Sequence, residues 1–230
     1  MQENKSKSSM VTIAAVAALL VGGIGGYVLK DSIGGSSDNT SVSRSSSTEP
    51  TTDTKAADLR TMLNGLQQEH VSLAAAATRA GFDGSRNFEA AAGALDNNTN
   101  DISAAVGSVY GEEAQTKFDE IWSSHIKFFV DYTVAAKGGD KAGMDQAVKN
   151  LGGYVDAIST FFSEANPNLP KEAVAQLVGE HVTLLKSAVD KYGAGDLAGS
   201  YASERQAREQ IGTIANTISG AIVKQSPDKF

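Results

Sequence analysis

The sequence predicts an all-α protein in which six helices form three tandem helical hairpins, preceded by one transmembrane helix. Three observations lead to this prediction. An uncharged, mostly apolar stretch, residues 10–29, lies near the amino terminus. From Ala57 onward apolar residues recur at spacings of three and four, as they do on one face of a helix. The three histidines of the chain, His70, His125 and His181, are 55 and then 56 residues apart, which indicates a pseudo-threefold repeat of about 55 residues.

The stretch 10–29 has the length of a membrane span. At about 1.5 Å per residue, a helix of twenty residues covers roughly 30 Å, the thickness of the hydrocarbon core of a bilayer. Lys5 and Lys7 precede it, and positive charge favours the cytoplasmic side. Residues 1–9 are therefore predicted to be a cytoplasmic tail, and everything after the anchor is predicted to lie outside a cell membrane. A cleaved signal peptide is the alternative, although no clean cleavage site follows Tyr27.

Residues 30–56 separate this anchor from the rest of the chain. Ser, Thr, Asp and Gly dominate them, and they contain too little apolar surface to repay the entropy of ordering. The sequence predicts a disordered linker here, a helical-repeat domain over 57–224, and a short tail, 225–230.

Glycine, asparagine and proline clusters mark the ends of the predicted helices. Five such breaks divide 57–224 into six helices: Gly81–Gly84, Tyr110–Gly111, Gly138–Asp140, Asn166–Pro170 and Gly193–Asp196. A glycine tolerates the left-handed conformation that ends a helix, and a following aspartate provides an acceptor for the free amides of the next helix. The clusters therefore predict turns with a structural role.

The repeat extends beyond the histidines to the second helix of each unit, where three isoleucines are 56 residues apart: Ile102, Ile158 and Ile214. Apolar residues also lie four before and three after each histidine, at the offsets of a core-facing seam. All three imidazoles are therefore predicted to point inward.

Two interpretations of the inward histidines remain open. They form either a repeated polar group of the core, each ring hydrogen-bonded locally, or a zinc or copper site built from His70, His125 and His181, with Glu69 and Glu180 as acceptors behind the imidazoles. In an open array of hairpins the first and third histidines would be about 20 Å or more apart, because neighbouring helices lie about 8–10 Å apart. A closed bundle could bring the rings together.

Composition and motifs argue against several other classes of protein. The net charge of −7 and the scattered basic residues do not suit nucleic acid, and the chain has no cysteine for disulfides or thiolate sites. No di-iron ExxH pair, HExxH zinc motif, phosphate-binding P-loop or dinucleotide fold is evident. Ser124 and His125 diverge by about 100° on one helix and cannot form a triad with Asp131.

Five segments carry a resemblance to a known family: Glu69–Val71, Ala91–Thr99, Ser108–Gly111, Ile121–Tyr132 and Asn166–Pro170. They resemble a family of exported bacterial helical domains, which in some Gram-positive proteins lies beside segments labelled as copper amine oxidase N-terminal-like. The resemblance covers nearly all of 57–222 and implies an exported bacterial setting, but no activity. Similar sequences often have His-Met where this chain has Gln210-Ile211, and this departure removes two potential copper ligands.

The sequence therefore predicts a membrane-anchored, extracytoplasmic binding or interaction module without catalytic activity and without a cofactor. Its partner would be an unidentified protein or small ligand outside the cell. The alternative is an extracytoplasmic zinc- or copper-binding protein that uses the three repeat-equivalent histidines.

Overall fold

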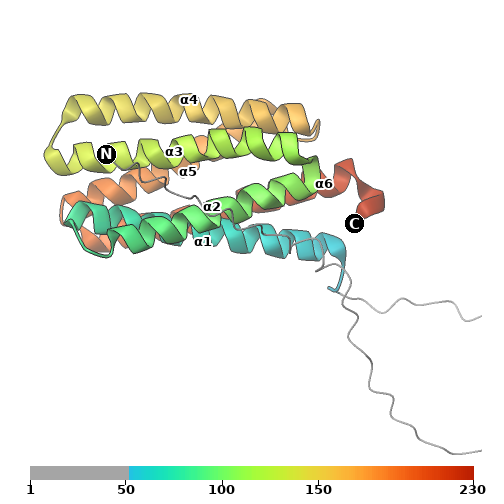
Figure 1. The fold of residues 1–230 in the computed structure, drawn as a ribbon, viewed down its shortest axis with the longest axis horizontal. Coiled ribbons are helices and arrows are strands. Elements are labelled where there is room, and N and C mark those ends of the chain that lie inside the picture. Colours follow the sequence, from blue (N-terminus) through green and yellow to red (C-terminus); the bar gives the residue numbers. More distant parts are fainter. Residues whose placement is uncertain (1–51) are drawn as a thin grey trace, which may run out of the picture. The chain divides into compact units, whose positions relative to one another are not determined.

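The structure is a computed structural model that describes residues 52–230 (Figure 1). Within that range the chain forms six α-helices and a final 3₁₀ turn: α1 (Lys55–Asp83), α2 (Phe88–Tyr110), α3 (Glu112–Gly138), α4 (Lys141–Ala165), α5 (Lys171–Gly193), α6 (Leu197–Gln225) and η1 (Pro227–Lys229). No strand occurs among these residues, so the predicted all-α class and six helices are confirmed.

The turns between helices use the residues that the sequence indicated. Gly139 ends α3 in the left-handed region, with a φ of 69°, and Asp140 follows it. The Asp140 carboxylate accepts a hydrogen bond of 3.0 Å from the backbone N–H of Gly143, so it caps α4. Asp196 caps α6 in the same way, through a bond of 2.9 Å from the N–H of Gly199.

Both ends of the helical domain differ from their predicted positions. α1 begins at Lys55 rather than Ala57, because the Thr54 hydroxyl accepts the backbone N–H of Ala57 and caps the helix two residues earlier. The predicted tail, 225–230, is not a simple extension: α6 continues to Gln225, η1 follows, and Phe230 packs against the core.

The predicted tail 1–9, the predicted anchor 10–29 and residues 30–51 of the predicted linker lie outside the described residues. Among the helices of the described part, none has both the length and the apolar character that crossing a membrane requires.

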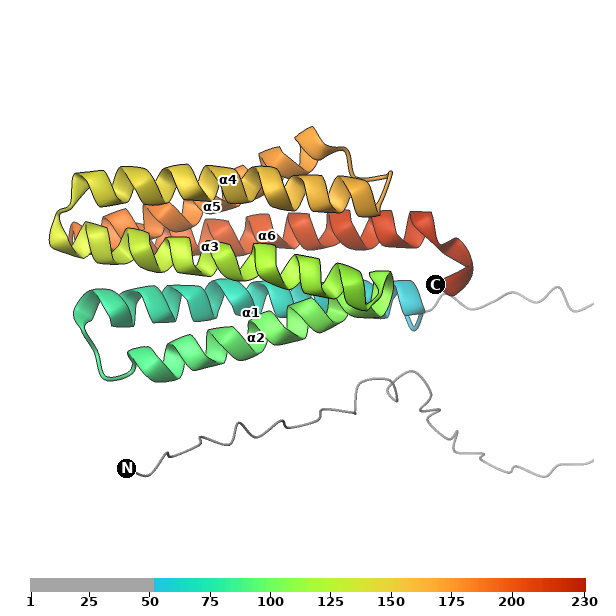
Figure 2. The same cartoon turned by 45° about the horizontal axis from the view of Figure 1, so that its top comes forward.

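The helices lie side by side (Figures 1 and 2), and the contacts between them repeat from one hairpin to the next and close into a ring with pseudo-threefold symmetry. The first helices of the hairpins, α1, α3 and α5, contact one another in the centre. Each second helix packs on two of them: α2 on α1 and α3, α4 on α3 and α5, and α6 on α5 and α1. The packing of α6 on α1 joins the last hairpin to the first, so the arrangement is a closed bundle and not an open array.

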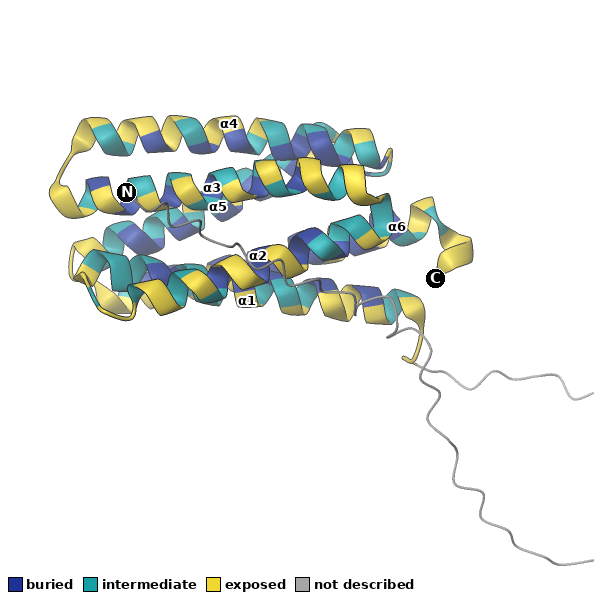
Figure 3. Cartoon of the chain, in the orientation of Figure 1, coloured by how far each residue is buried: buried dark blue, intermediate teal, exposed yellow. Residues whose placement is uncertain are grey.

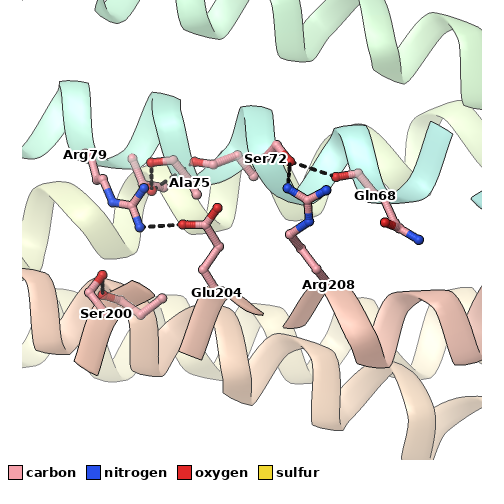
Figure 4. Close-up of polar contacts among 10 residues, drawn as sticks. Gln68, Ser72, Ala75, Arg79, Ser200, Glu204 and Arg208 are labelled. Atoms are coloured by element: carbon pink, nitrogen blue, oxygen red, sulfur yellow. Dashed lines mark hydrogen bonds and ion pairs between the residues drawn. The ribbon is translucent and has the colours of Figure 1, made fainter. Parts of the chain in front are cut away.

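Polar contacts reinforce the closure between α1 and α6 (Figure 4). Arg79 of α1 forms an ion pair with Glu204 of α6, and both side chains are largely buried. Further along the interface, Arg208 donates a hydrogen bond of 2.9 Å to the Ser72 hydroxyl. These contacts lie between elements more than a hundred residues apart in the chain.

The inward faces of the helices hold the core, while the outer faces are exposed (Figure 3). Aromatic residues of α3 and α4 contribute much of it, and Phe118 stacks on Trp122 with ring centroids 5.2 Å apart. The helical spacing of apolar residues therefore corresponds to burial, as the amphipathic pattern predicted.

Candidate functional site

The three central helices bring the three histidines together. His70 lies on α1, His125 on α3 and His181 on α5, with exposed fractions of 2%, 6% and 8%. The Nε2 atoms of His70 and His125 are 3.4 Å apart. All three side chains line one small internal cavity of about 40 Å³. The predicted burial of the imidazoles is thus confirmed, and the closed bundle places all three at one cavity.

Protein acceptors orient two of the rings. Nδ1 of His125 contacts the carbonyl oxygen of Trp122, and the ring stacks on Tyr154 with centroids 4.5 Å apart. Nδ1 of His181 lies 3.2 Å from Oε1 of Gln210. Because carbonyl and amide oxygens only accept hydrogen bonds, Nδ1 carries the proton in both rings and Nε2 keeps its lone pair.

The partners of the histidines are themselves repeat-equivalent. Asn98, Tyr154 and Gln210 each come four residues before one of the aligned isoleucines, on the second helix of their hairpins. The Asn98 amide donates to the carbonyl of Leu66 at 3.0 Å, and the Gln210 amide donates to that of Leu177 at 2.6 Å. Both carbonyls lie one helical turn before a histidine. The sequence analysis missed this second layer, although its spacing from the isoleucines was a signal.

The predicted carboxylate acceptors do not contact the imidazoles. Glu69 is exposed and accepts a hydrogen bond of 3.1 Å from the amide of Asn98, which lies beside His70. Glu180 is also exposed, and the acceptor that His181 uses is Gln210. An amide on the neighbouring helix replaces the predicted carboxylate because a residue adjacent to the histidine on its own helix points about 100° away.

Three buried nitrogens around the histidines lack a hydrogen-bond partner: Nδ1 of His70, Nε2 of His181 and Nε1 of Trp122. The Asn98 side chain lies near His70 and raises the pKa of that imidazole. Its Oδ1 atom is nevertheless also buried without a hydrogen-bond partner. Buried polar atoms in folded proteins are nearly always paired. This concentration of unpaired atoms therefore distinguishes the cluster from the rest of the core.

Burial keeps the histidines neutral. It lowers the pKa of His125 to about 3 and that of His181 to about 4. Burial also holds the pKa of His70 well below its ordinary value, and the nearby His125 and His181 lower it further. At pH 7 the cluster therefore presents uncharged imidazoles. Within residues 52–230, however, no group of three or more His, Asp or Glu side chains is arranged, as it stands, to hold a metal ion.

A second, much larger cavity adjoins the cluster. It has a volume of about 920 Å³ and lies among α1, α2, α3 and α5, near the turn that joins α1 to α2. Small residues form much of its wall: Ala74, Ala75, Ala77, Ala80, Ala92 and Gly93. His70 and His125 line its buried part, while the exposed Val130 and Val134 lie at its surface. The two histidines thus belong to both cavities.

No family model, curated protein or solved structure matches this chain. The resemblance to exported bacterial helical domains therefore stays a prediction, and a function has to be argued from the geometry of the two cavities.

Proposed function

We propose that the helical domain is a binding module without catalytic activity, which takes an apolar small molecule into the cavity among α1, α2, α3 and α5. We also propose that residues 10–29 hold the domain at the outer side of a cell membrane. The observation that carries the binding proposal is the 920 Å³ cavity, which lies within the range of about 300–1,000 Å³ typical of ligand pockets.

The chemistry of the wall supports an apolar occupant. Several of its polar groups are already paired within the protein: the Thr133 hydroxyl donates to the carbonyl of Phe129 and the Ser200 hydroxyl to that of Ala188, both at 2.8 Å. The Arg79 side chain is held by Glu204. A ligand would therefore gain most from contact with alanine and valine side chains, since burial of apolar surface stabilises by about 25 cal/mol per Å².

The environment of the histidines supports a binding role over catalysis. A general base is most effective when its pKa lies near the working pH, whereas burial lowers the pKa of His125 to about 3. In the described part of the chain, the groups hydrogen-bonded to the imidazoles are backbone carbonyls, amide side chains and another imidazole, rather than a carboxylate that would stabilise an imidazolium.

Fluorescence of N-phenyl-1-naphthylamine, an uncharged apolar probe, tests the proposal on the full chain. The wild type should enhance the emission saturably. Ala92→Phe, which places a large side chain in the cavity wall, should weaken binding by about tenfold or more, because it removes volume that the probe needs. Ala90→Phe is the matched control: it lies on the same helix, is exposed and does not line the cavity, so its affinity should stay within about twofold.

A second pair of variants tests the entrance. Val134→Lys places a charge at the surface of the cavity and should also weaken probe binding, whereas Val148→Lys makes the same change at an exposed valine of α4. Equal affinities of the wild type, Ala92→Phe and Val134→Lys would show that the probe binds elsewhere and would overturn the proposal.

A further inference from the structure

We propose that His70, His125 and His181 bind one zinc or copper ion through their Nε2 atoms, at the small cavity that adjoins the large apolar one. This site does not require the apolar ligand, so it stands or falls separately from the function proposed above.

The separation of the first two ligands suits a metal ion. Zinc binds imidazole nitrogen at about 2.0–2.1 Å, and its ligands form a tetrahedron. Two nitrogens at these distances, with a tetrahedral angle between them, are about 3.3–3.4 Å apart. The Nε2 atoms of His70 and His125 are 3.4 Å apart, although the histidines come from different helices and lie 55 residues apart in the chain.

The orientation of the rings also suits a metal ion. Metal-binding histidines generally donate the N–H of their other ring nitrogen to a carbonyl or carboxylate, which fixes the ring and directs the free lone pair at the ion. His125 does this through the carbonyl of Trp122, and His181 through the amide oxygen of Gln210. Nδ1 of His70 has no such partner, so in the metal-free protein its Nε2–H donates to Nε2 of His125. Metal binding requires the His70 ring proton to move to Nδ1, which frees both Nε2 lone pairs for the ion.

His181 supplies the third ligand. Its Nε2 atom is buried and has no hydrogen-bond partner. The side chain lines the same 40 Å³ cavity as His70 and His125, and its charged form would repel theirs. Since the three side chains do not yet surround a single point, binding requires the His181 ring to move toward the other two, and the small cavity that all three line provides space for this movement.

The donor set defines the class of ion. Three neutral imidazoles, with no thiolate or carboxylate, suit zinc and copper, whereas magnesium and calcium require oxygen ligands. Among the described residues, no Asp, Glu or further His lines the small cavity, and His70 and His125 also line the large one. A bound metal would therefore remain accessible to water or to a small molecule from that side.

Metal titration of the full chain, purified in detergent and stripped with EDTA, tests the proposal directly. We expect one zinc or copper ion per chain by elemental analysis, and a visible absorption band typical of tetrahedral coordination when Co²⁺ replaces zinc. At free zinc 100 times the dissociation constant, Tm should rise by about 5–10 °C. No bound metal and no change in Tm in the wild type would overturn the proposal and leave a hydrogen bond between His70 and His125 as the interpretation of their contact.

Variants show which side chains hold the ion. His70→Ala, His125→Ala and His181→Ala should each abolish stoichiometric binding, with circular dichroism confirming that the variant is folded. Gln210→Ala keeps all three ligands but frees the His181 ring, so the affinity should fall by about 10–100-fold. Gln225→Ala is its matched control on the same helix, because this glutamine bonds the carbonyl of Ala165 away from the cluster.

The same titration separates this inference from the proposed function. Ala92→Phe should lose the apolar probe and still bind the metal, since residue 92 lines the large cavity but not the small one. Stoichiometric metal binding that persists after all three histidines are replaced would place the ion elsewhere and overturn the assignment.

Discussion

Acidification from pH 8 to pH 5 should destabilise this bundle through its buried histidines. Burial lowers the pKa of His125 to about 3 and that of His181 to about 4, whereas an unfolded histidine titrates near 6.5. At a pH between the folded and the unfolded pKa values, the unfolded state binds protons that the folded state does not. The contribution of the neutral histidines to stability is therefore complete above pH 6.5 and is lost as the pH falls toward the folded pKa values.

The size of the effect follows from those pKa values. At pH 5 the unfolded chain binds nearly one proton at each of the two positions, and the folded chain binds almost none. Each histidine then lowers the free energy of unfolding by about 2 kcal/mol relative to pH 8, or about 4 kcal/mol for the pair. His70, whose pKa burial also lowers, adds to this loss. A total stability of about 5–15 kcal/mol makes such a loss large.

Urea denaturation of the full chain at half-unit steps of pH, in detergent with EDTA, measures this dependence. Near pH 5 the slope of the unfolding free energy against pH should correspond to uptake of at least about two protons on unfolding. His181→Gln should reduce that uptake by about one proton, because it removes one titrating group. Stability that stays constant from pH 8 to pH 5 would refute the reasoning, since it would mean that the histidines are solvated or already charged in the folded protein.

Two further predictions concern the closure of the ring and the amino terminus. Arg79→Ala breaks the largely buried ion pair with Glu204 and should lower the free energy of unfolding, measured by urea denaturation, by about 2 kcal/mol. Lys117→Ala breaks an exposed pair with Glu164 and should lower it by no more than about 0.5 kcal/mol. Equal losses in the two variants would contradict the role of the α1–α6 contact. Amino-terminal sequencing of protein from the membrane fraction should find residues before Met10, because the anchor is predicted to be retained, and a mature chain that starts after Leu29 would contradict it.

Local chemistry made the helices predictable. Asp140 and Asp196 cap α4 and α6 through backbone amides three residues away, so a short stretch of sequence contains the whole interaction. The same locality explains the error at Lys55: the cap that begins α1 is Thr54, one of many Ser and Thr residues in that segment, and composition alone could not single it out.

The candidate site was predictable only in part. The seam of apolar residues indicated that His70, His125 and His181 are buried, because helical periodicity identifies the inward face. It did not identify Gln210 as the acceptor for His181 or Tyr154 as the ring stacked on His125. Those contacts join different helices, and the register between two helices depends on how their side chains interlock.

The sequence by itself determined the number of helices, the hairpin repeat and the inward orientation of the histidines. Helix ends and the buried face depend on residues within a few turns of one another, and the repeat is visible in the 55- and 56-residue spacing of the histidines. Only the tertiary structure decided that α6 packs on α1, that the Nε2 atoms of His70 and His125 lie 3.4 Å apart, and that a 920 Å³ cavity adjoins them. The physical reason is that an amphipathic helix specifies which face it buries but not which neighbour covers that face. An open array and a closed ring can bury similar apolar stripes, and the contacts between the first and last hairpins, including Arg79 with Glu204, distinguish the ring.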